Sequence, residues 1–249
     1  MNKKPFDAII FDLGGTLIYF NGDWEEVLKT AGGMMIDSLR ESGLNLGDDF
    51  FGTFFTRLEN YYRERESEYV EYTTLHLLHV LLLELGNENV PDVVLRRALG
   101  ELYAVTQSYW KTEEDAISTL NALREQGYRL GMISNAGDDS DVQALVDQAG
   151  IRPFFDIILT SATEGIRKPN PKIFQKCLDF LRVTPQRSAM VGDTLVADIL
   201  GAHNAGIYSI WIKRRANRPE NLTYSSSIKP HAYIDALGEL PDLLERLAS

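Results

Sequence analysis

The chain has 249 residues, 44% of them hydrophobic and 24% charged, which indicates a globular protein with a substantial core and excludes disorder over most of its length. The formal net charge is −11, and so acidic a surface repels nucleic-acid phosphates and anionic lipid, so we expect no nucleic acid and no membrane among the partners. The single cysteine, Cys177, excludes an intrachain disulfide and favours a reducing, cytoplasmic location.

The first part of the chain is predicted to contain one buried strand followed by helices. Residues 8–11 form a short apolar run with acidic residues on both sides, so we expect a strand there and no signal peptide. Residues 19–111 lack a strand pattern and are rich in leucine, glutamate, arginine and aromatic residues, which predicts a helical insertion. Its most apolar stretch, residues 75–85, is too short to span a bilayer and is expected to be a buried helix.

The rest of the chain is predicted to alternate strands with helices. Strands are expected over residues 130–134, 157–160, 189–191 and 208–212. Apolar residues at helical spacing predict helices around residues 142–149, 173–181 and 240–247. We expect Asn170 to be the N-cap of the second of these helices and Pro171 its first residue. The polar residues 214–230 are expected to form a loop.

This alternation of apolar strands with amphipathic helices indicates an α/β fold, in which helices cover both faces of a doubly wound parallel sheet. We expect a core domain made of residues 1–18 and 112–249. A helical cap domain of residues 19–111 would be inserted after the first strand, with the active site between the two domains. The sequence does not predict an oligomeric state.

Polar side chains follow several of the predicted strands at the points where the strands end. Asp12 follows the first strand, Ser134 and Asn135 end the second, and Asp193 follows the strand over residues 189–191. Lys168 lies in the loop after residues 157–160. The carboxyl ends of parallel strands share one edge of a sheet, where ligands bind, so we expect these side chains to converge.

The residue types in this set suit phosphoryl chemistry. The carboxylates of Asp12 and Asp193 are ligands for a hard cation such as Mg²⁺, and a lysine and a hydroxyl suit phosphoryl oxygens. The turn of residues 14–16 contains two glycines, and its N–H groups are expected to cradle an anion. Such donors would offset the charge of a transferring phosphoryl group, and an ionised aspartate could attack its phosphorus atom.

Four segments resemble the four motifs of the haloacid dehalogenase (HAD) superfamily, in the family's order and across nearly the whole chain. They are Phe11-Asp12-Leu13-Gly14-Gly15-Thr16-Leu17, Met132-Ile133-Ser134-Asn135, Arg167-Lys168-Pro169-Asn170-Pro171, and Val191-Gly192-Asp193 with Asp198-Ile199 and Gly201-Ala202. The helical insertion is similar in position to the family's cap.

The resemblance implies a role for each matching residue. Asp12 would be the nucleophile, and Lys168 would act with it in catalysis. The phosphate would be held by Ser134, Asn135, Lys168 and Thr16. The Mg²⁺ ion would be held by Asp12, Asp193, the main-chain oxygen of Gly14 and, as a further contact, Asp198, which equally fits a residue placed to favour a helix dipole.

One position departs from the family pattern. Family phosphatases usually carry a second aspartate two residues after the nucleophile, which protonates the leaving group and later activates water, and here that position is Gly14. General acid–base catalysis is commonly worth about 10²- to 10⁴-fold. The enzyme could be slow on alkyl phosphates, could prefer good leaving groups, or could take the proton from a cap residue such as His76 or His79. The alternative for both histidines is a structural position in the core or at an interface.

The leading hypothesis is therefore a Mg²⁺-dependent phosphatase that acts on a small phosphorylated metabolite through an aspartyl phosphate at Asp12. One alternative is a carbon–halogen hydrolase that uses the same nucleophile, although the segment from Asp193 to Asp198 resembles the metal-binding branches of the family. The other alternative is a catalytically weak member that binds a phosphorylated ligand.

Overall fold

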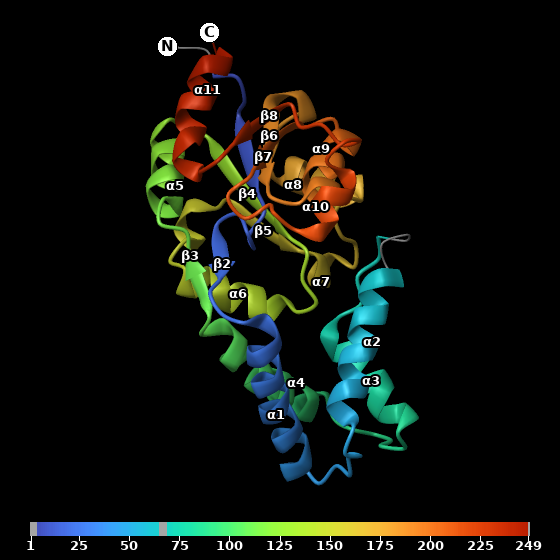
Figure 1. Ribbon diagram of the computed structural model, residues 1–249. Helices are drawn as coiled ribbons and strands as arrows, with labels where there is room; N and C mark the ends of the chain where they lie inside the picture. The colour runs from blue at the N-terminus through green and yellow to red at the C-terminus, as the bar shows by residue number, and fades with distance from the viewer. Residues whose placement is uncertain (1–3, 65–68, 249) are drawn as a thin grey trace.

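A six-stranded parallel sheet lies at the centre of the structure, a computed structural model that describes residues 4–64 and 69–248 (Figure 1). The strands are β1 (Ala8–Phe11), β4 (Arg129–Ser134), β5 (Ile157–Thr160), β6 (Ser188–Gly192), β7 (Tyr208–Ile212) and β8 (Ala232–Ile234). Their order is β5-β4-β1-β6-β7-β8, and every neighbouring pair is parallel. The chain builds outward from β1 in both directions, which confirms the predicted doubly wound sheet.

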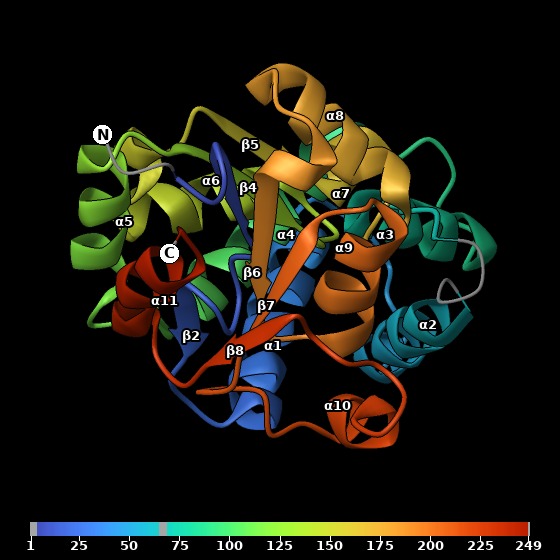
Figure 2. The same ribbon diagram turned by 90° about the horizontal axis from the view of Figure 1, so that it is seen from above.

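Helices cover both faces of this sheet (Figure 2). One face packs against α5 (Ala116–Glu125), α6 (Asp139–Gln148) and α11 (Leu240–Ala248), and the other against α8 (Pro171–Leu181) and α9 (Gly201–Asn204). Side chains of β1 alternate between these layers, as successive residues of a strand must. Ile9 and Phe11 belong to the first apolar cluster, whereas Ala8 and Ile10 belong to the second.

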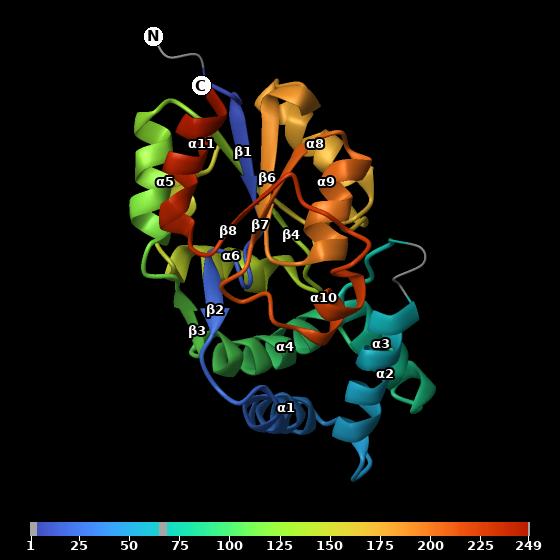
Figure 3. The ribbon, with the colours of Figure 1, turned by 45° about the horizontal axis from the view of Figure 1, so that its top comes forward.

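The segment between the first strand and the rest of the core forms a group of helices below the sheet in Figures 1 and 3. These are α1 (Trp24–Glu41), α2 (Phe50–Glu64), α3 (Thr74–Glu84) and α4 (Asp92–Gln107). They share an apolar cluster of their own, which includes Met35, Phe54 and Leu95. The predicted helical insertion is therefore present, and its division from the core as a separate domain stays a prediction.

The chain enters and leaves these helices through two short strands that the sequence did not predict. Strands β2 (Ile18–Phe20) and β3 (Trp110–Thr112) pair in antiparallel fashion, with Ile18 opposite Thr112. They form a separate two-stranded ribbon beside the carboxyl end of β1. The two crossings between core and helices are therefore held together by main-chain hydrogen bonds.

The remaining elements are short and lie in the loops. They are η1 (Arg152–Phe154), α7 (Ser161–Glu164), η2 (Pro185–Arg187), the π-helical η3 (Leu195–Leu200), α10 (Pro219–Tyr224) and η4 (Leu237–Glu239). The prediction that residues 214–230 are a plain loop is wrong, because α10 lies within them. Within the described ranges, no helix combines the length and the apolar character needed to cross a bilayer.

Candidate functional site

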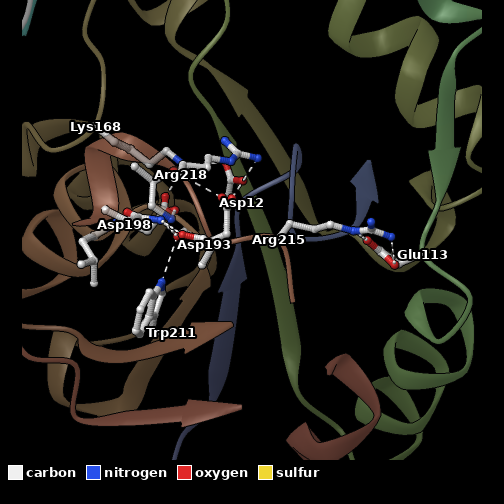
Figure 4. A network of polar contacts seen from close by, with 12 residues as sticks. Asp12, Glu113, Lys168, Asp193, Asp198, Trp211, Arg215 and Arg218 are labelled. Carbon is white, nitrogen blue, oxygen red and sulfur yellow. Dashed lines mark hydrogen bonds and ion pairs between the residues drawn. The ribbon is translucent and has the colours of Figure 1, made fainter. Parts of the chain in front are cut away.

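Parallel register brings the ends of three strands to one level of the sheet. Phe11 of β1 lies opposite Met132 on one side and Val191 on the other, so the residues that follow each strand emerge beside one another. Figure 4 shows the result: Asp12 and Asp193 meet Lys168 and Asp198 at the carboxyl edge of the sheet. The structure thus brings together side chains that are far apart in sequence, as the strand pattern predicted.

Lys168 is the centre of this cluster. Its buried Nζ donates to Asp12 Oδ1 at 2.7 Å and to Asp198 Oδ1 at 2.6 Å. Burial alone would lower the pKa of Lys168, but the two carboxylates outweigh it and raise that pKa above its ordinary value. The lysine therefore stays charged, and it holds the nucleophile candidate Asp12 in a fixed orientation.

Asp198 and Asp193 are both fully buried beside this lysine. Burial raises the pKa of Asp198 to about 6, against the lowering effect of Lys168, while its Oδ2 accepts from the Thr194 amide at 2.9 Å. Burial, and then the charge of Asp12, raise the pKa of Asp193 to about 8. When all three carboxyl groups are ionised, their charge exceeds that of Lys168.

This cluster fits a divalent metal ion. Asp12, Asp193 and Asp198 each offer a carboxylate oxygen, and these atoms lie within 4.8 Å of one another. Asp193 Oδ2 is buried and, among the described residues, accepts no hydrogen bond, although Arg218 Nη2 lies 3.0 Å away at ion-pair distance. A buried carboxylate oxygen without a hydrogen bond, in an all-oxygen set, suits a hard cation such as Mg²⁺.

The turn after β1 is shaped by Gly15, whose φ is +84°, and a Cβ there would overlap the carboxylate of Asp193. The amide of Gly15 donates to the Ile18 carbonyl at 2.7 Å, and that of Thr16 to the Leu13 carbonyl at 3.3 Å. The amides of Gly15 and Thr16 are therefore occupied within the turn, and the structure gives no support to an anion cradle made from these two. Thr16 is also fully buried, and the structure gives no support to its predicted phosphate contact.

Ser134 and Asn135 differ in what they do. Ser134 ends β4 and lines the site cavity. Asn135 also lines it, but its Nδ2 donates to the Lys168 carbonyl at 2.9 Å and its Oδ1 accepts from the Lys168 amide at 2.8 Å. Its amide group is thus occupied in joining two loops and in placing Lys168, which leaves Ser134 better placed than Asn135 for a ligand.

The cavity at the site has a volume of about 350 Å³. Asp12, Gly14, Lys168 and Asp198 are among the residues that line it. Its other lining residues are Leu13, Ile18, Trp110, Ser134, Asn135, Ala136, Asp141, Val142, Leu145, Arg167, Thr194, Ala197 and Arg218. A second cavity of about 740 Å³ adjoins it and shares Lys168. Together they give space for a small ligand whose charged end reaches Asp12.

Several of these residues were missed by the sequence analysis. Arg218 lies in the segment predicted to be a plain loop, and nothing in its spacing marked it. The buried Asn221 holds that segment in place, because its Nδ2 donates to the Asp193 carbonyl at 2.8 Å and its Oδ1 accepts from the Leu195 amide at 2.8 Å. Asp141 was hidden among the acidic residues of an ordinary helix start.

The two histidines considered as proton donors do not reach the site. His76 is exposed and stacks on Tyr72, with ring centroids 5.5 Å apart, so the core reading is wrong for it. His79 is partly buried in α3. Neither belongs to the described residues that line the cavity, so the structure gives no support to a role as the acid for either of them.

Comparisons with known proteins agree with this arrangement. A family model described as haloacid dehalogenase-like hydrolase matches residues 6–206. A glyceraldehyde 3-phosphate phosphatase of Methanopyrus kandleri is 31% identical over 243 residues, which cover 97% of this chain and 98% of that protein. A HAD phosphatase from Thermococcus onnurineus has a TM-score of 0.65 at 25% identity, covering 96% and 97% of the two chains. A 2-haloacid dehalogenase from Pseudomonas syringae, with a TM-score of 0.68 at 22% identity over 97% and 99%, shows the shared fold alone.

Proposed function

Because the chain belongs to the haloacid dehalogenase-like hydrolases, we propose that it is a Mg²⁺-dependent phosphatase with Asp12 as its nucleophile. The observation that carries the proposal is the position of Lys168 Nζ, which donates to both Asp12 and Asp198, and all three residues line the cavity. The unbonded oxygen of Asp193 lies in the same cluster. The carboxylates can hold a metal ion, and the fixed charge of Lys168 can stabilise the negative charge of a phosphoryl group under attack.

Each residue has a part in the reaction. Ser134 and Lys168 bind the phosphoryl oxygens and hold phosphorus in line with Asp12. An Asp12 oxygen forms a bond to phosphorus as the bond to the leaving-group oxygen breaks, and water later attacks the aspartyl phosphate and releases inorganic phosphate. Asp12, Asp193, Asp198 and the main-chain oxygen of Gly14 would hold Mg²⁺, which when bound neutralises charge on the phosphoryl group.

The substrate that we propose is a small phosphorylated metabolite, with glyceraldehyde 3-phosphate as the first compound to test. The Methanopyrus kandleri relative bears the name of that phosphatase and matches the present chain almost from end to end. A cavity of about 350 Å³ is at the small end of ligand sites, which suits a three-carbon phosphate.

Helices α1–α4 would form the cap domain of this enzyme, over residues 19–111, and would select the substrate. Residues from both sides of the proposed boundary line the cavity, since Trp110 belongs to β3 and Leu145 to α6. Movement of the helices on the β2–β3 ribbon would admit the substrate and then exclude water.

The test is release of inorganic phosphate from glyceraldehyde 3-phosphate and p-nitrophenyl phosphate, with and without Mg²⁺. We expect activity that needs the metal and that falls by about 10³-fold or more in Asp12→Asn. Full activity in that variant would end the proposal. Release of chloride from a 2-haloacid without metal would instead identify a dehalogenase, and ligand-induced stabilisation without turnover would identify a binding protein.

A further inference from the structure

Gly14 has no side chain that could donate a proton, so a general acid of this enzyme would lie at another position. A Cβ placed on Gly14 would make an ordinary contact with the Trp110 ring at 3.4 Å. An alkyl leaving group still needs a proton as its bond to phosphorus breaks. Another group that lines the cavity can supply that proton.

Few of the described residues that line the site cavity carry titratable or charged side chains. They are Asp12, Asp141, Arg167, Lys168, Asp198 and Arg218. Asp12 is the nucleophile of the proposed function, and the two arginines stay charged. Lys168 and Asp198 are bonded to each other at 2.6 Å and share the metal site. Among these described lining residues, Asp141 is the carboxyl group that remains.

Asp141 is held in place from two sides. It lies in the first turn of α6, where its amide donates to the N-cap side chain of Asp138 at 3.1 Å. Its Oδ1 accepts from Gln107 Nε2 at 2.9 Å, and Gln107 is the last residue of α4. In the part of the chain that the structure describes, Oδ2 accepts no hydrogen bond, so one oxygen of Asp141 is anchored and the other can meet a ligand.

We propose that Asp141 is the general acid and base of this enzyme, in place of the carboxyl that is absent at position 14. This inference rests on the proposed phosphatase function. Asp141 lines the same cavity as Asp12, together with Val142 and Leu145. A phosphate ester with its phosphorus at Asp12 would therefore have its leaving oxygen inside the cavity that Asp141 lines.

The protonation of Asp141 agrees with this role. Burial raises its pKa to about 6, the hydrogen bond from Gln107 opposes that rise, and the charge of Asp138 adds to it. A carboxyl group with such a pKa is present in both protonated and ionised forms near neutral pH.

Several elements next to Asp141 carry other charged groups. Arg167, Lys168 and Arg218 line the cavity with it, as do the carboxyl groups of Asp12 and Asp198. Asp139 lies on its own helix and accepts from Thr160 Oγ1 at 2.7 Å. The adjoining α7 carries Glu164, which is paired with Lys176, and the near end of α4 contributes the neutral Gln107.

The proton balance closes over one turnover. In the first step the P–O bond to the leaving group breaks, its electron pair stays on the leaving oxygen, and the Asp141 carboxyl gives its proton to that oxygen. In the second step the Asp141 carboxylate takes a proton from the attacking water, while the bond between phosphorus and Asp12 breaks. The Asp12 carboxylate and the Asp141 carboxylic acid are then both restored.

The test compares Asp141→Asn on an alkyl phosphate, glyceraldehyde 3-phosphate, and on an aryl phosphate, p-nitrophenyl phosphate. The ratio kcat/KM reports steps up to departure of the leaving group. We expect it to fall by about 10²- to 10⁴-fold for the alkyl ester and by less than about 10-fold for the aryl ester, whose leaving group needs no proton. We also expect a burst of p-nitrophenol, because the phosphoenzyme then lacks its base.

Two further variants make the test specific. Asp139→Asn removes a carboxylate from the same helix turn outside the cavity lining, and it should leave both ratios unchanged within about twofold. Gln107→Leu removes the hydrogen bond that lowers the pKa of Asp141, so the fall of kcat/KM for the alkyl ester at alkaline pH should move to higher pH.

If Asp141→Asn lowered kcat/KM equally for both esters and gave no burst, Asp141 would have a structural role and the inference would be overturned. The inference would also be overturned if Gln107→Leu did not move the fall of kcat/KM at alkaline pH. The proposed function fails in a different way. In that case the wild-type protein would release no phosphate, or Asp12→Asn would keep its activity, whatever Asp141→Asn did.

Discussion

Arg218 Nη2 lies 3.0 Å from Asp193 Oδ2, the buried carboxylate oxygen that accepts no hydrogen bond from the described residues. The arginine is at the N-cap of α10, and Asn221 fixes that helix beneath the Asp193 main chain. The guanidinium group is therefore a cation supplied by the protein at an oxygen that we propose as a metal ligand.

Arg218→Ala should increase the apparent affinity for Mg²⁺, because the side chain no longer competes for Asp193. Arg218 is 44% exposed in its side chain, so the effect should be modest, about 2- to 5-fold in the Mg²⁺ concentration that gives half-maximal activity. Titration of phosphatase activity with MgCl₂ measures it, with Arg218→Lys as the control that keeps the charge. A higher requirement for Mg²⁺ in the alanine variant would contradict the prediction.

Lys168→Met should destabilise the protein by about 3–5 kcal/mol, because it leaves the buried carboxylates of Asp12 and Asp198 without their shared cation. Urea unfolding without metal measures the loss, and added Mg²⁺ should return part of it, since the ion offsets the same charges. Lys172→Met is the matched control at an exposed position nearby, and it should change stability by less than about 0.5 kcal/mol. Equal stability of the two variants would refute this view of the cluster.

Gly15→Ala and Gly14→Ala should behave differently although the two residues are adjacent. Gly15 has a φ of +84° and no room for a Cβ beside Asp193, so alanine there should cost about 1–3 kcal/mol and disturb metal binding. At Gly14 a Cβ would make an ordinary contact with Trp110 at 3.4 Å, and alanine should be nearly neutral. Thermal unfolding of both variants, with and without Mg²⁺, compares them. Similar melting temperatures would contradict the geometry.

Asp141→Asn should stabilise the protein at pH 8 but not at pH 4. The folded-state pKa of Asp141 is about 6, above its ordinary value of 3.8, so the unfolded chain binds fewer protons between these values and wild-type stability falls as pH rises through that window. Asparagine removes this loss, which we expect to be about 2–3 kcal/mol. Urea unfolding at the two pH values measures the difference. An equal effect of the substitution at both would show that the carboxyl does not titrate in this way.

Much of the core could be predicted because its elements carry strong local signals. Residues 8–11 and 157–160 are apolar runs of strand length, and both are strands with those bounds. Asn170 accepts from the Lys172 amide as the N-cap of α8, and Pro171 begins that helix, as predicted. These signals are local, so they can be read from the sequence without knowing the rest of the fold.

The missed features depend on contacts between distant segments. Strands β2, β3 and β8 have three residues each, too short for a period, and they form only because a partner strand is present. Arg218 reaches Asp193 through the packing of α10, and Asp141 reaches the cavity because α6 begins beside the end of α4. The hydrogen bonds that the amides of the turn at Gly15 make within the turn also depend on tertiary geometry.

The β2–β3 ribbon has a consequence for how such enzymes can diversify. Both crossings of the chain meet at one paired junction, and Arg215 fastens it to the core by stacking on Tyr19 at 4.0 Å and donating to Glu113 at 2.8 Å. The stretch between the strands therefore begins and ends at one junction, although its helices also contact the core, as Gln107 does at Asp141 and the Thr74 amide does at the Gly137 carbonyl. Recombination at two closely spaced cuts could exchange the proposed substrate-selecting module between relatives, and the new module would then have to supply its own partner for Asp141.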